Sequence, residues 1–213
     1  MDVKELSFDP IARARALLTL EPGAGGLGRG PAGDHALNPG QIEVETALAV
    51  AKPAAVLIGL IARPDGATVL LTERATHLRS HSGQVAFPGG KIDPQDAGPI
   101  AAALREAQEE IGLDPRHVEP FGLLEPYLSG SGYRITPVVA EIHAPFDLAI
   151  NHHEVADVFE TPLEFLLEPG NHKRQSREWQ GVMRHYYEMP WKNRYIWGVT
   201  AGILRHFYER LIP

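Results

Sequence analysis

The period of the hydrophobic pattern changes several times along the chain, and each change predicts a new element of secondary structure. Residues 99–111 show the clearest helical period, because Ile100, Leu104, Ala107 and Ile111 recur at spacings of three and four. The glycine that follows them is a typical helix end. Weaker patterns predict further helices at residues 10–20, 162–167 and 198–211.

Short apolar or alternating runs bounded by turn residues predict the strands. These runs lie at residues 54–63, 68–72, 85–87, 121–127, 133–142, 154–159 and 182–189. Pro64-Asp65-Gly66 separates the first two runs and is a turn sequence, so we expect these runs to form a hairpin. Strands around one strong helix, with a second helix at the end of the chain, are typical of an α/β or α+β layered domain.

The first 40 residues differ from the rest of the chain in composition. Asp9 and Pro10 are a suitable N-cap and first residue for the helix at 10–20. Residues 22–40 then contain seven Gly and three Pro, which predicts a mobile linker. We therefore expect residues 1–40 to be an N-terminal helix and Gly-rich linker, dispensable for chemistry, and residues 41–213 to be the functional domain.

Composition excludes several classes of protein. The 213 residues include no cysteine, so disulfides, thiolate zinc sites and cysteine nucleophiles are excluded. The longest apolar run, Ala54 to Ala62 with Gly59 included, is shorter than the ~20 residues that span a bilayer, and the chain does not begin like a signal peptide. A formal charge of −7 argues against nucleic acid and anionic membranes as partners. We expect a soluble, cytoplasmic protein.

The candidate chemistry lies on the helix at 99–111. Around the helix axis, with Arg105 at 0°, Glu109 lies at about 40°, Glu106 at about 100° and Glu110 at about 140°. The three carboxylates therefore share one face, opposite the apolar positions. Arg105 precedes Glu109 by four residues, so it can pair with Glu109 and hold its orientation. Like charges at this spacing repel one another unless a cation is present, and oxygen ligands in this number suit Mg²⁺ or Mn²⁺.

The alternative interpretation is a solvated acidic helix face, which is common in proteins. The residues upstream favour a site instead. Phe87-Pro88-Gly89-Gly90-Lys91 is a turn sequence whose glycines let the main chain approach a ligand or a metal closely. A glycine turn followed by an acidic helix can present carbonyl and carboxylate oxygens to one ion.

Gly90 to Leu113 resembles the Nudix box, whose pattern is Gly, five residues, Glu, seven residues, and Arg-Glu-aliphatic-x-Glu-Glu-x-Gly-aliphatic. The chain has Gly90, five residues, Asp96, eight residues, and Arg105-Glu106-Ala107-Gln108-Glu109-Glu110-Ile111-Gly112-Leu113. Asp96 replaces the first glutamate of the pattern, and its spacing to Arg105 is one residue longer. The first half of the box should therefore loop differently.

Leu70 to Gly90 is similar to a second and more discriminating signature, that of coenzyme A pyrophosphatases within the Nudix superfamily. That signature is Leu-Leu-Thr-x-Arg-(Ser/Ala), three residues, Arg, three residues, Gly, three residues, Phe-Pro-Gly-Gly, and the chain matches every fixed position. The stretched box with an aspartate is usual in that subfamily. The resemblance does not cover the first 40 residues.

The resemblance implies a Nudix-type α/β/α sandwich with a mixed β-sheet. The implied activity is hydrolysis of the diphosphate bond of coenzyme A, or its derivatives, to 3′,5′-ADP and 4′-phosphopantetheine. The implied cofactor is Mg²⁺ or Mn²⁺, bound by Glu106, Glu109, Glu110 and the carbonyl of Gly90. One of these carboxylates could instead be the general base. Glu154 lies where such enzymes often supply a further acidic residue from a late loop, and an ordinary surface position is its alternative.

Three cations are our candidates for binding the phosphates of the substrate: Arg74, Arg79 and Lys91. Arginine offers planar, bidentate donors that stay charged. Structural pairing with the acidic helix is the alternative for the two arginines, and Lys91 can take either part.

The expected partner is a small nucleoside diphosphate substrate, coenzyme A, with no nucleic acid or membrane partner and with a homodimer as a further possibility. A Nudix hydrolase of another nucleoside diphosphate derivative, such as ADP-ribose or a dinucleotide, is the first alternative. A non-catalytic binding module with the same fold is the second. The basic residues between 173 and 194 predict a solvated hairpin, or else a contact with substrate or with a neighbouring subunit.

Overall fold

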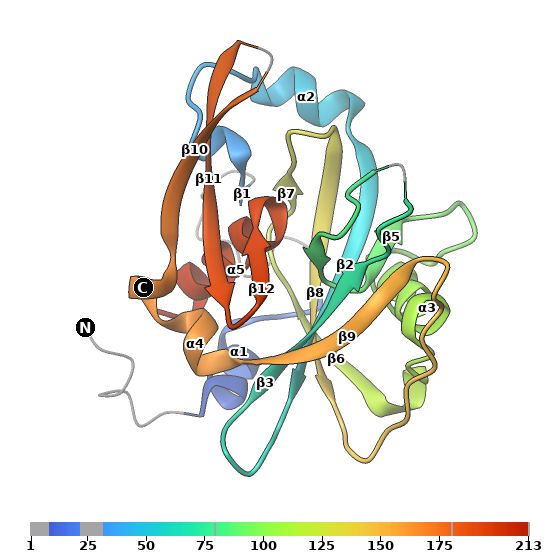
Figure 1. Cartoon of the computed structure of the whole chain (residues 1–213). Coiled ribbons are helices and arrows are strands. Elements are labelled where there is room, and N and C mark those ends of the chain that lie inside the picture. Colours follow the sequence, from blue (N-terminus) through green and yellow to red (C-terminus); the bar gives the residue numbers. More distant parts are fainter. Residues whose placement is uncertain (1–8, 22–31, 79, 180, 213) are drawn as a thin grey trace.

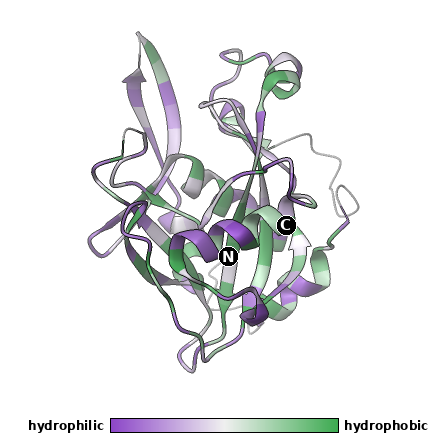
Figure 2. Cartoon of the chain, turned by 90° about the vertical axis from the view of Figure 1, so that its right-hand side faces the viewer, coloured by the Kyte–Doolittle hydropathy of each residue, from purple (hydrophilic) through white to green (hydrophobic). Residues whose placement is uncertain are grey.

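The computed structural model describes residues 9–21, 32–78, 80–179 and 181–212. In this part of the chain, helices cover both faces of a large β-sheet, and a smaller sheet lies beside it (Figure 1). Hydrophobic residues gather on the inner strands and helices, whereas hydrophilic residues colour the outer loops (Figure 2). No helix among the described residues is long and apolar enough to cross a membrane.

The α-helices are α1 Pro10–Leu17, α2 Val44–Val50, α3 Pro99–Ile111, α4 Leu163–Leu167 and α5 Gly198–Leu211. Short 3₁₀ helices occupy Asp34–Ala36, Pro115–His117 and Pro169–Asn171. The strands of the large sheet are β1 Ala32–Gly33, β2 Lys52–Ile61, β3 Thr68–Arg74, β4 Val85–Ala86, β5 Gly89–Lys91, β6 Val118–Leu123, β7 Tyr127–Leu128, β8 Tyr133–Ile142 and β9 Val155–Pro162. The strands of the small sheet are β10 Lys173–Trp179, β11 Val182–Trp191 and β12 Arg194–Trp197.

β2 is the central strand of the large sheet. It pairs in parallel with β8 and antiparallel with β3 and β5. The order of the described strands is β1-β7-β8-β2-β3-β4, with β6 paired to β8 and β9 paired to β3. The sheet is therefore mixed, and β2 and β3 form the predicted hairpin.

Successive side chains of β2 enter two different cores. Leu57 lies in a core with Ala103 and Ile111 of α3, whereas the next residue, Ile58, lies in a core with side chains of α1, α4 and α5. Because successive side chains of a strand point to opposite faces, α3 covers one face of the sheet and the other three helices cover the opposite face. Burial on both faces also explains the nearly continuous apolar sequence of β2. The predicted layered fold with a mixed sheet is confirmed.

The predicted boundaries differ most from the structure in two places. The first helix ends at Leu17 and not at residue 20, since its C-cap Leu18 has an extended backbone. The single strand predicted at 121–127 is wrong, because β6 ends at Leu123 and β7 begins at Tyr127. Pro126 lies between them and has no N–H to donate to a ladder.

The hydrophobic pattern did not predict α2, β5, β10 or β12. Helix α2 buries none of its side chains, and β10 is exposed along its whole length. β10 therefore has no apolar period that a sequence could display, whereas the helical spacing of Val44, Ala47 and Leu48 in α2 is short and was missed. β5 consists of two glycines and a lysine, a composition that is weak for a strand.

The prediction of a mobile linker at 22–40 does not hold for residues 32–40, and residues 22–31 lie outside the described residues. β1 pairs with β7, and the Asp34 carboxylate accepts hydrogen bonds from the Tyr127 hydroxyl at 2.6 Å and from the Gly130 N–H at 2.8 Å. A Cβ at Gly33 would collide with the Leu128 carbonyl, so this glycine serves close packing. The domain boundary at residue 40 stays a prediction.

Helix α1 is part of the core. As predicted, Asp9 is its N-cap and accepts hydrogen bonds from the N–H groups of Ile11 and Ala12. Ile11 is 6% exposed and Ala14 is fully buried, and Arg13 Nε donates to the Leu211 carbonyl of α5 at 3.3 Å. The N-terminal segment thus contributes to the stability of the domain, which its glycine-rich sequence did not indicate.

We expect Ile11→Ala to lower the free energy of unfolding by about 2–5 kcal/mol, because it leaves a cavity in the core shared with α5. Ala16→Ser, on the exposed side of the same helix, should change it by less than about 0.5 kcal/mol. Denaturant titrations of both variants measure the difference. An unchanged midpoint for Ile11→Ala would contradict the docking of α1.

Candidate functional site

The ends of α3 place its acidic face next to two loops. Gly112 ends the helix with φ at 67°, and its N–H donates to the Gln108 carbonyl at 3.0 Å, as the predicted glycine stop requires. The chain then returns to this helix end, because the Ala149 N–H donates to the Ile111 carbonyl at 2.8 Å and the Asn151 N–H donates to the Glu110 carbonyl at 2.9 Å. The loop that carries Glu154 is therefore fixed against the end of α3.

The three glutamates of α3 share one side of the helix but differ strongly in exposure. The side chain of Glu110 is 4% exposed, that of Glu106 is 16% exposed and that of Glu109 is 56% exposed. Ala107 and Ile111, on the core-facing side, are buried. The gradient follows from the helix geometry, since Glu110 lies nearest to the core-facing side and Glu109 lies farthest from it.

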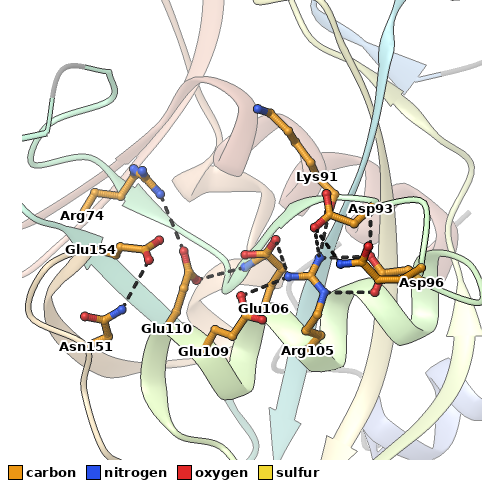
Figure 3. A network of polar contacts seen from close by, with 12 residues as sticks. Arg74, Lys91, Asp93, Asp96, Arg105, Glu106, Glu109, Glu110, Asn151 and Glu154 are labelled. Atoms are coloured by element: carbon orange, nitrogen blue, oxygen red, sulfur yellow. Dashed lines mark hydrogen bonds and ion pairs between the residues drawn. The ribbon is translucent and has the colours of Figure 1, made fainter.

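Arg105 is the centre of an ion-pair network that joins α3 to the loop before it (Figure 3). Its guanidinium contacts both carboxylate oxygens of Asp96, at 3.0 Å each. It also donates to Glu106 and Glu109, at 3.1 Å each, and to the Lys91 carbonyl at 3.1 Å. Arginine has five N–H donors, so this set uses all of them. Arg105 therefore orients carboxylates and has no donor left for a substrate.

Asp96 is the residue that replaces the first glutamate of the box. The hydrogen bonds from Arg105 hold the pKa of the Asp96 carboxyl below its usual range, and its contacts raise the pKa of Arg105. Asp93 lies 3.9 Å from the same guanidinium. Sequence reasoning paired Arg105 with Glu109 alone, although the aspartate in the first half of the box was a signal for this second partner.

Gly90 and Glu106 lie against each other. A Cβ at Gly90 would collide with the Glu106 carboxylate, so the absence of a side chain lets this carboxylate reach the main chain of β5. Burial raises the pKa of Glu106, the contact with Arg105 opposes that shift, and the charges of Glu109 and Glu154 add to it.

Glu110 is the buried acid of the site. Burial raises its pKa to about 7, while the Gly89 N–H at 3.1 Å and the charge of Arg74 oppose the shift. Arg74 Nη1 lies 3.7 Å from Glu110 Oε1. The charges of Glu106 and Glu154 raise the pKa further. Ionisation of the buried Glu110 carboxyl group therefore costs free energy, and a cation nearby would remove this cost.

Glu154 and Arg74 reach the same region from two other elements (Figure 3). The Asn151 side-chain amide donates to Glu154 at 3.3 Å, and the Glu154 carbonyl accepts from the Ala75 N–H at 2.9 Å, directly after β3. The charge of Glu154 affects both Glu106 and Glu110. Arg74 Nε is buried without a hydrogen-bond partner among the described residues. The structure thus brings both predicted residues to the acidic helix.

The other two predicted cations are Arg79 and Lys91. Arg79 lies outside the described residues. Lys91 is exposed, and its side chain points away from the Glu106 and Glu110 carboxylates (Figure 3). Its contribution to the network is its main-chain carbonyl, which accepts from Arg105.

A second group of potential metal ligands, Glu119, Glu141 and His143, lies outside this site. Arg15 of α1 contacts both of its carboxylates, at 2.8 Å each. An arginine therefore already compensates the charge of this group, and its contacts attach α1 to the sheet.

The donor set on α3 fits a hard divalent cation. Its potential ligands are carboxylate oxygens and the oxygens of the β5 main chain, the ligand type that Mg²⁺ and Mn²⁺ prefer. Burial raises the pKa values of Glu106 and Glu110, and the arginines beside them only partly oppose that shift. Because Gly90 has no side chain, the Glu106 carboxylate lies close to the main chain of β5.

Comparison with known proteins identifies the class. Residues 51–195 match the NUDIX domain family. The chain is 44% identical over 158 residues to an uncharacterised Nudix hydrolase, NudL, of Yersinia pestis (strain Pestoides F). The aligned residues cover 74% of this chain and 79% of that protein. NudL of Yersinia pseudotuberculosis serotype O:1b (strain IP 31758) shows the same identity and coverage.

Solved structures give lower similarity. The Nudix hydrolase RenU from M. smegmatis has 27% identity and a TM-score of 0.46, covering 53% of this chain and 71% of that chain. The NUDIX domain of Shewanella oneidensis NrtR, solved with ADP ribose, has 21% identity and a TM-score of 0.43, covering 60% and 87%.

The chain belongs to the Nudix family. It is a Nudix hydrolase, and hydrolases of this family generally use divalent metal ions.

Glu110 should make the metal-free protein less stable as the pH rises. Its folded pKa of about 7 lies above its ordinary value of 4.5. Between these values the folded state binds more protons than the unfolded state, so stability falls as the pH increases through that interval. We expect Glu110→Gln, which cannot ionise, to be more stable than the wild type by about 2–3 kcal/mol above neutral pH and equally stable near pH 4.5.

Thermal unfolding in the presence of a chelator, from about pH 5 to about pH 8, measures this difference. Glu109→Gln is the matched control, because Glu109 is the exposed glutamate of the same face. A stability difference between Glu110→Gln and the wild type that does not change with pH would contradict the assignment.

Gly90→Ala should displace the Glu106 carboxylate, because the new Cβ would occupy its position. We expect Mn²⁺ affinity and turnover to fall by about 10- to 100-fold, measured by titration calorimetry and kinetics. The clash should also lower the melting temperature, and Gly90→Ala/Glu106→Ala should recover part of that loss. Wild-type Mn²⁺ affinity in Gly90→Ala would mean that Glu106 is not needed in its present position.

Proposed function

We propose that this Nudix hydrolase cleaves the diphosphate bond of coenzyme A, giving 3′,5′-ADP and 4′-phosphopantetheine. The observation that carries the proposal is the signature from Leu70 to Gly90, which matches the coenzyme A pyrophosphatase pattern at every fixed position. These residues form β3, β4 and the start of β5, and they deliver Arg74 to the acidic helix. The two signatures therefore converge on one site.

Glu106, Glu109, Glu110 and the carbonyl of Gly90 are the proposed ligands of Mg²⁺ or Mn²⁺. When bound, such an ion offsets the negative charge of a diphosphate and makes water more acidic. Glu106 and Glu110 lie deepest in the site, whereas Glu109 is exposed and bonded to Arg105. Glu109 is therefore the ligand that we expect to matter least.

Glu154 is the proposed general base. Glu106 and Glu109 each contact Arg105, and Glu110 accepts a main-chain hydrogen bond and contacts Arg74. Among the described residues, the side-chain partner of Glu154 is the neutral amide of Asn151. Because Glu106, Glu109 and Glu110 are the proposed metal ligands, Glu154 is the carboxylate of the site that stays available to accept a proton from an attacking water.

Arg74 and Arg79 are the proposed phosphate ligands, and the structure changes how they can be tested. Arg74 contacts Glu110, so its removal would disturb the acidic site as well as any phosphate contact. Arg79, proposed from its place in the signature, is the better test of specificity. Coenzyme A differs from dephospho-coenzyme A by one 3′-phosphate, and a selective enzyme needs a cation for that group.

The test compares kcat/KM for coenzyme A, dephospho-coenzyme A, ADP-ribose and NADH with Mg²⁺ and with Mn²⁺. We expect coenzyme A to be preferred. A charge-assisted hydrogen bond contributes about 1.5–3 kcal/mol, so Arg79→Ala should reduce the preference for coenzyme A over dephospho-coenzyme A by about 10- to 150-fold. Arg134→Ala, which removes an exposed arginine outside both signatures, is the control and should leave the preference unchanged.

Four results would overturn parts of the proposal. A preference for ADP-ribose or NADH would identify a different Nudix hydrolase, and binding without hydrolysis would identify a non-catalytic module. If Arg79→Ala lowers kcat/KM equally for coenzyme A and dephospho-coenzyme A, Arg79 contacts the diphosphate or stabilises the fold. Glu110→Gln should abolish most turnover on every substrate, and full activity in that variant would remove the metal-site assignment.

A further inference from the structure

The small sheet has one edge that no described strand covers. β10 pairs with β11 over seven residues, and β11 pairs with β12 on its other side, so β10 is the end strand. Every residue of β10 is exposed. In Figure 1 the free end of β10 and β11 extends away from the large sheet. An exposed strand edge of this length is a template for pairing with another strand.

Contacts of Asn38 determine which backbone groups face this edge. The Asn38 side chain accepts from the His185 N–H at 2.8 Å and donates to the His185 carbonyl at 2.9 Å, so both groups of His185 point away from β10. Ser176 lies opposite His185, and opposite residues of an antiparallel ladder point these groups either toward each other or apart. The N–H and C=O of Ser176 therefore point outward, and so do those of Arg174 and Glu178.

The sequence of β10 is complementary to itself. When two copies pair antiparallel about a two-fold axis at Ser176, all seven residues of β10 are matched. Arg174 then lies opposite Glu178 of the second copy, twice by symmetry, and both residues have outward-pointing main-chain groups. Opposite charges across two strands stabilise their pairing. Within the described part of the chain neither side chain has an ion-pair partner, and Arg174 donates to the Leu37 carbonyl at 3.3 Å.

Neighbouring registers are less favourable. An axis at Gln175 places Lys173 opposite Arg177, and an axis at Arg177 places that residue opposite its own copy. Both registers bring like charges together, which destabilises the pairing of two strands. The charges of β10 therefore select the register centred on Ser176.

Exposed apolar side chains lie close to the same edge. Trp179 is 53% exposed, Val182 is 44% exposed and Met183 is 48% exposed, at the outer end of the β10–β11 pair. In the register centred on Ser176, Lys173 of one copy lies opposite Trp179 of the other, a pair that can form a cation–π contact. Pairing of the two edges would bring this apolar surface close to a second molecule.

We propose that the β10 edge is the interface of a homodimer, in which two copies of the chain join their small sheets into one continuous antiparallel sheet through the register centred on Ser176. The proposal is independent of the substrate, because no residue of β10 belongs to the candidate site. The occupant is a second copy of the chain because the charge pattern matches itself.

Light scattering coupled to size exclusion, from about 1 to about 100 μM protein, is the first test. We expect the wild type to change from 23.3 kDa toward twice that mass with rising concentration. Ser176→Pro removes an N–H that points outward, so it leaves the ladder to β11 intact and should be monomeric. Ser176→Ala keeps the N–H and should behave as the wild type. A monomeric wild type, or a Ser176→Pro dimer of wild-type affinity, would overturn the proposal.

Charge reversal tests the register without proline. Arg174→Glu alone and Glu178→Arg alone each place like charges opposite each other twice, so each should raise the dimer Kd by about tenfold or more, or about 1.4 kcal/mol. An equimolar mixture of the two variants should form a heterodimer, because each Glu then faces an Arg. Dimers that resist both single reversals, or a mixture that stays monomeric where the wild type dimerises, would exclude this register.

Discussion

The close packing of β5 between β2 and α3 is the constraint on which the site depends. A side chain at Gly89 would meet the main chain of β2, and a side chain at Gly90 would meet the Glu106 carboxylate. Because neither residue has one, β5 brings the Gly89 N–H to Glu110 at 3.1 Å and lets Glu106 lie against Gly90. Gly90 acts through close approach, whereas Gly89 also has φ at 152°, a backbone conformation that residues with a side chain rarely adopt. The acidic helix would be a solvated face without them.

The buried carboxylates of the site lower the stability of the folded protein, and the rest of the fold has to offset this loss. Burial raises the pKa values of Glu106 and Glu110, which means that their ionised forms cost stability in the folded protein. Arg105 reduces this cost for Glu106, while its two bonds to Asp96 tie the loop before α3 to the helix. The apolar cores on both faces of β2 supply the opposing stability. The buried carboxylates of the candidate site therefore oppose the folding stability that the apolar side of α3 provides.

Sequence reasoning succeeded where a residue type has one physical consequence. The apolar period placed α3 from residue 99 to residue 111, and helix geometry placed the carboxylates opposite its buried side. It failed where a residue type has two possible physical consequences. The glycine-rich segment predicted mobility, yet Gly33 serves close packing against β7, and β10 carries no apolar period because it is exposed on both faces. Partners distant in the sequence, such as Asn151 beside Glu154, depend on tertiary structure that no local pattern records.

Arg74 connects the two signatures, and its position reconciles the two interpretations that the sequence left open. It lies 3.7 Å from Glu110 and compensates a buried charge, which is the structural interpretation. That distance is longer than a hydrogen bond, and its Nε is buried without a partner among the described residues. The contact with Glu110 therefore does not use all the donors of the Arg74 guanidinium. Under the proposed function, a divalent cation would take over the compensation of Glu110, and the planar donors of Arg74 would then be available to a phosphate. Under the proposed function, structural pairing and substrate binding are thus compatible roles of one arginine.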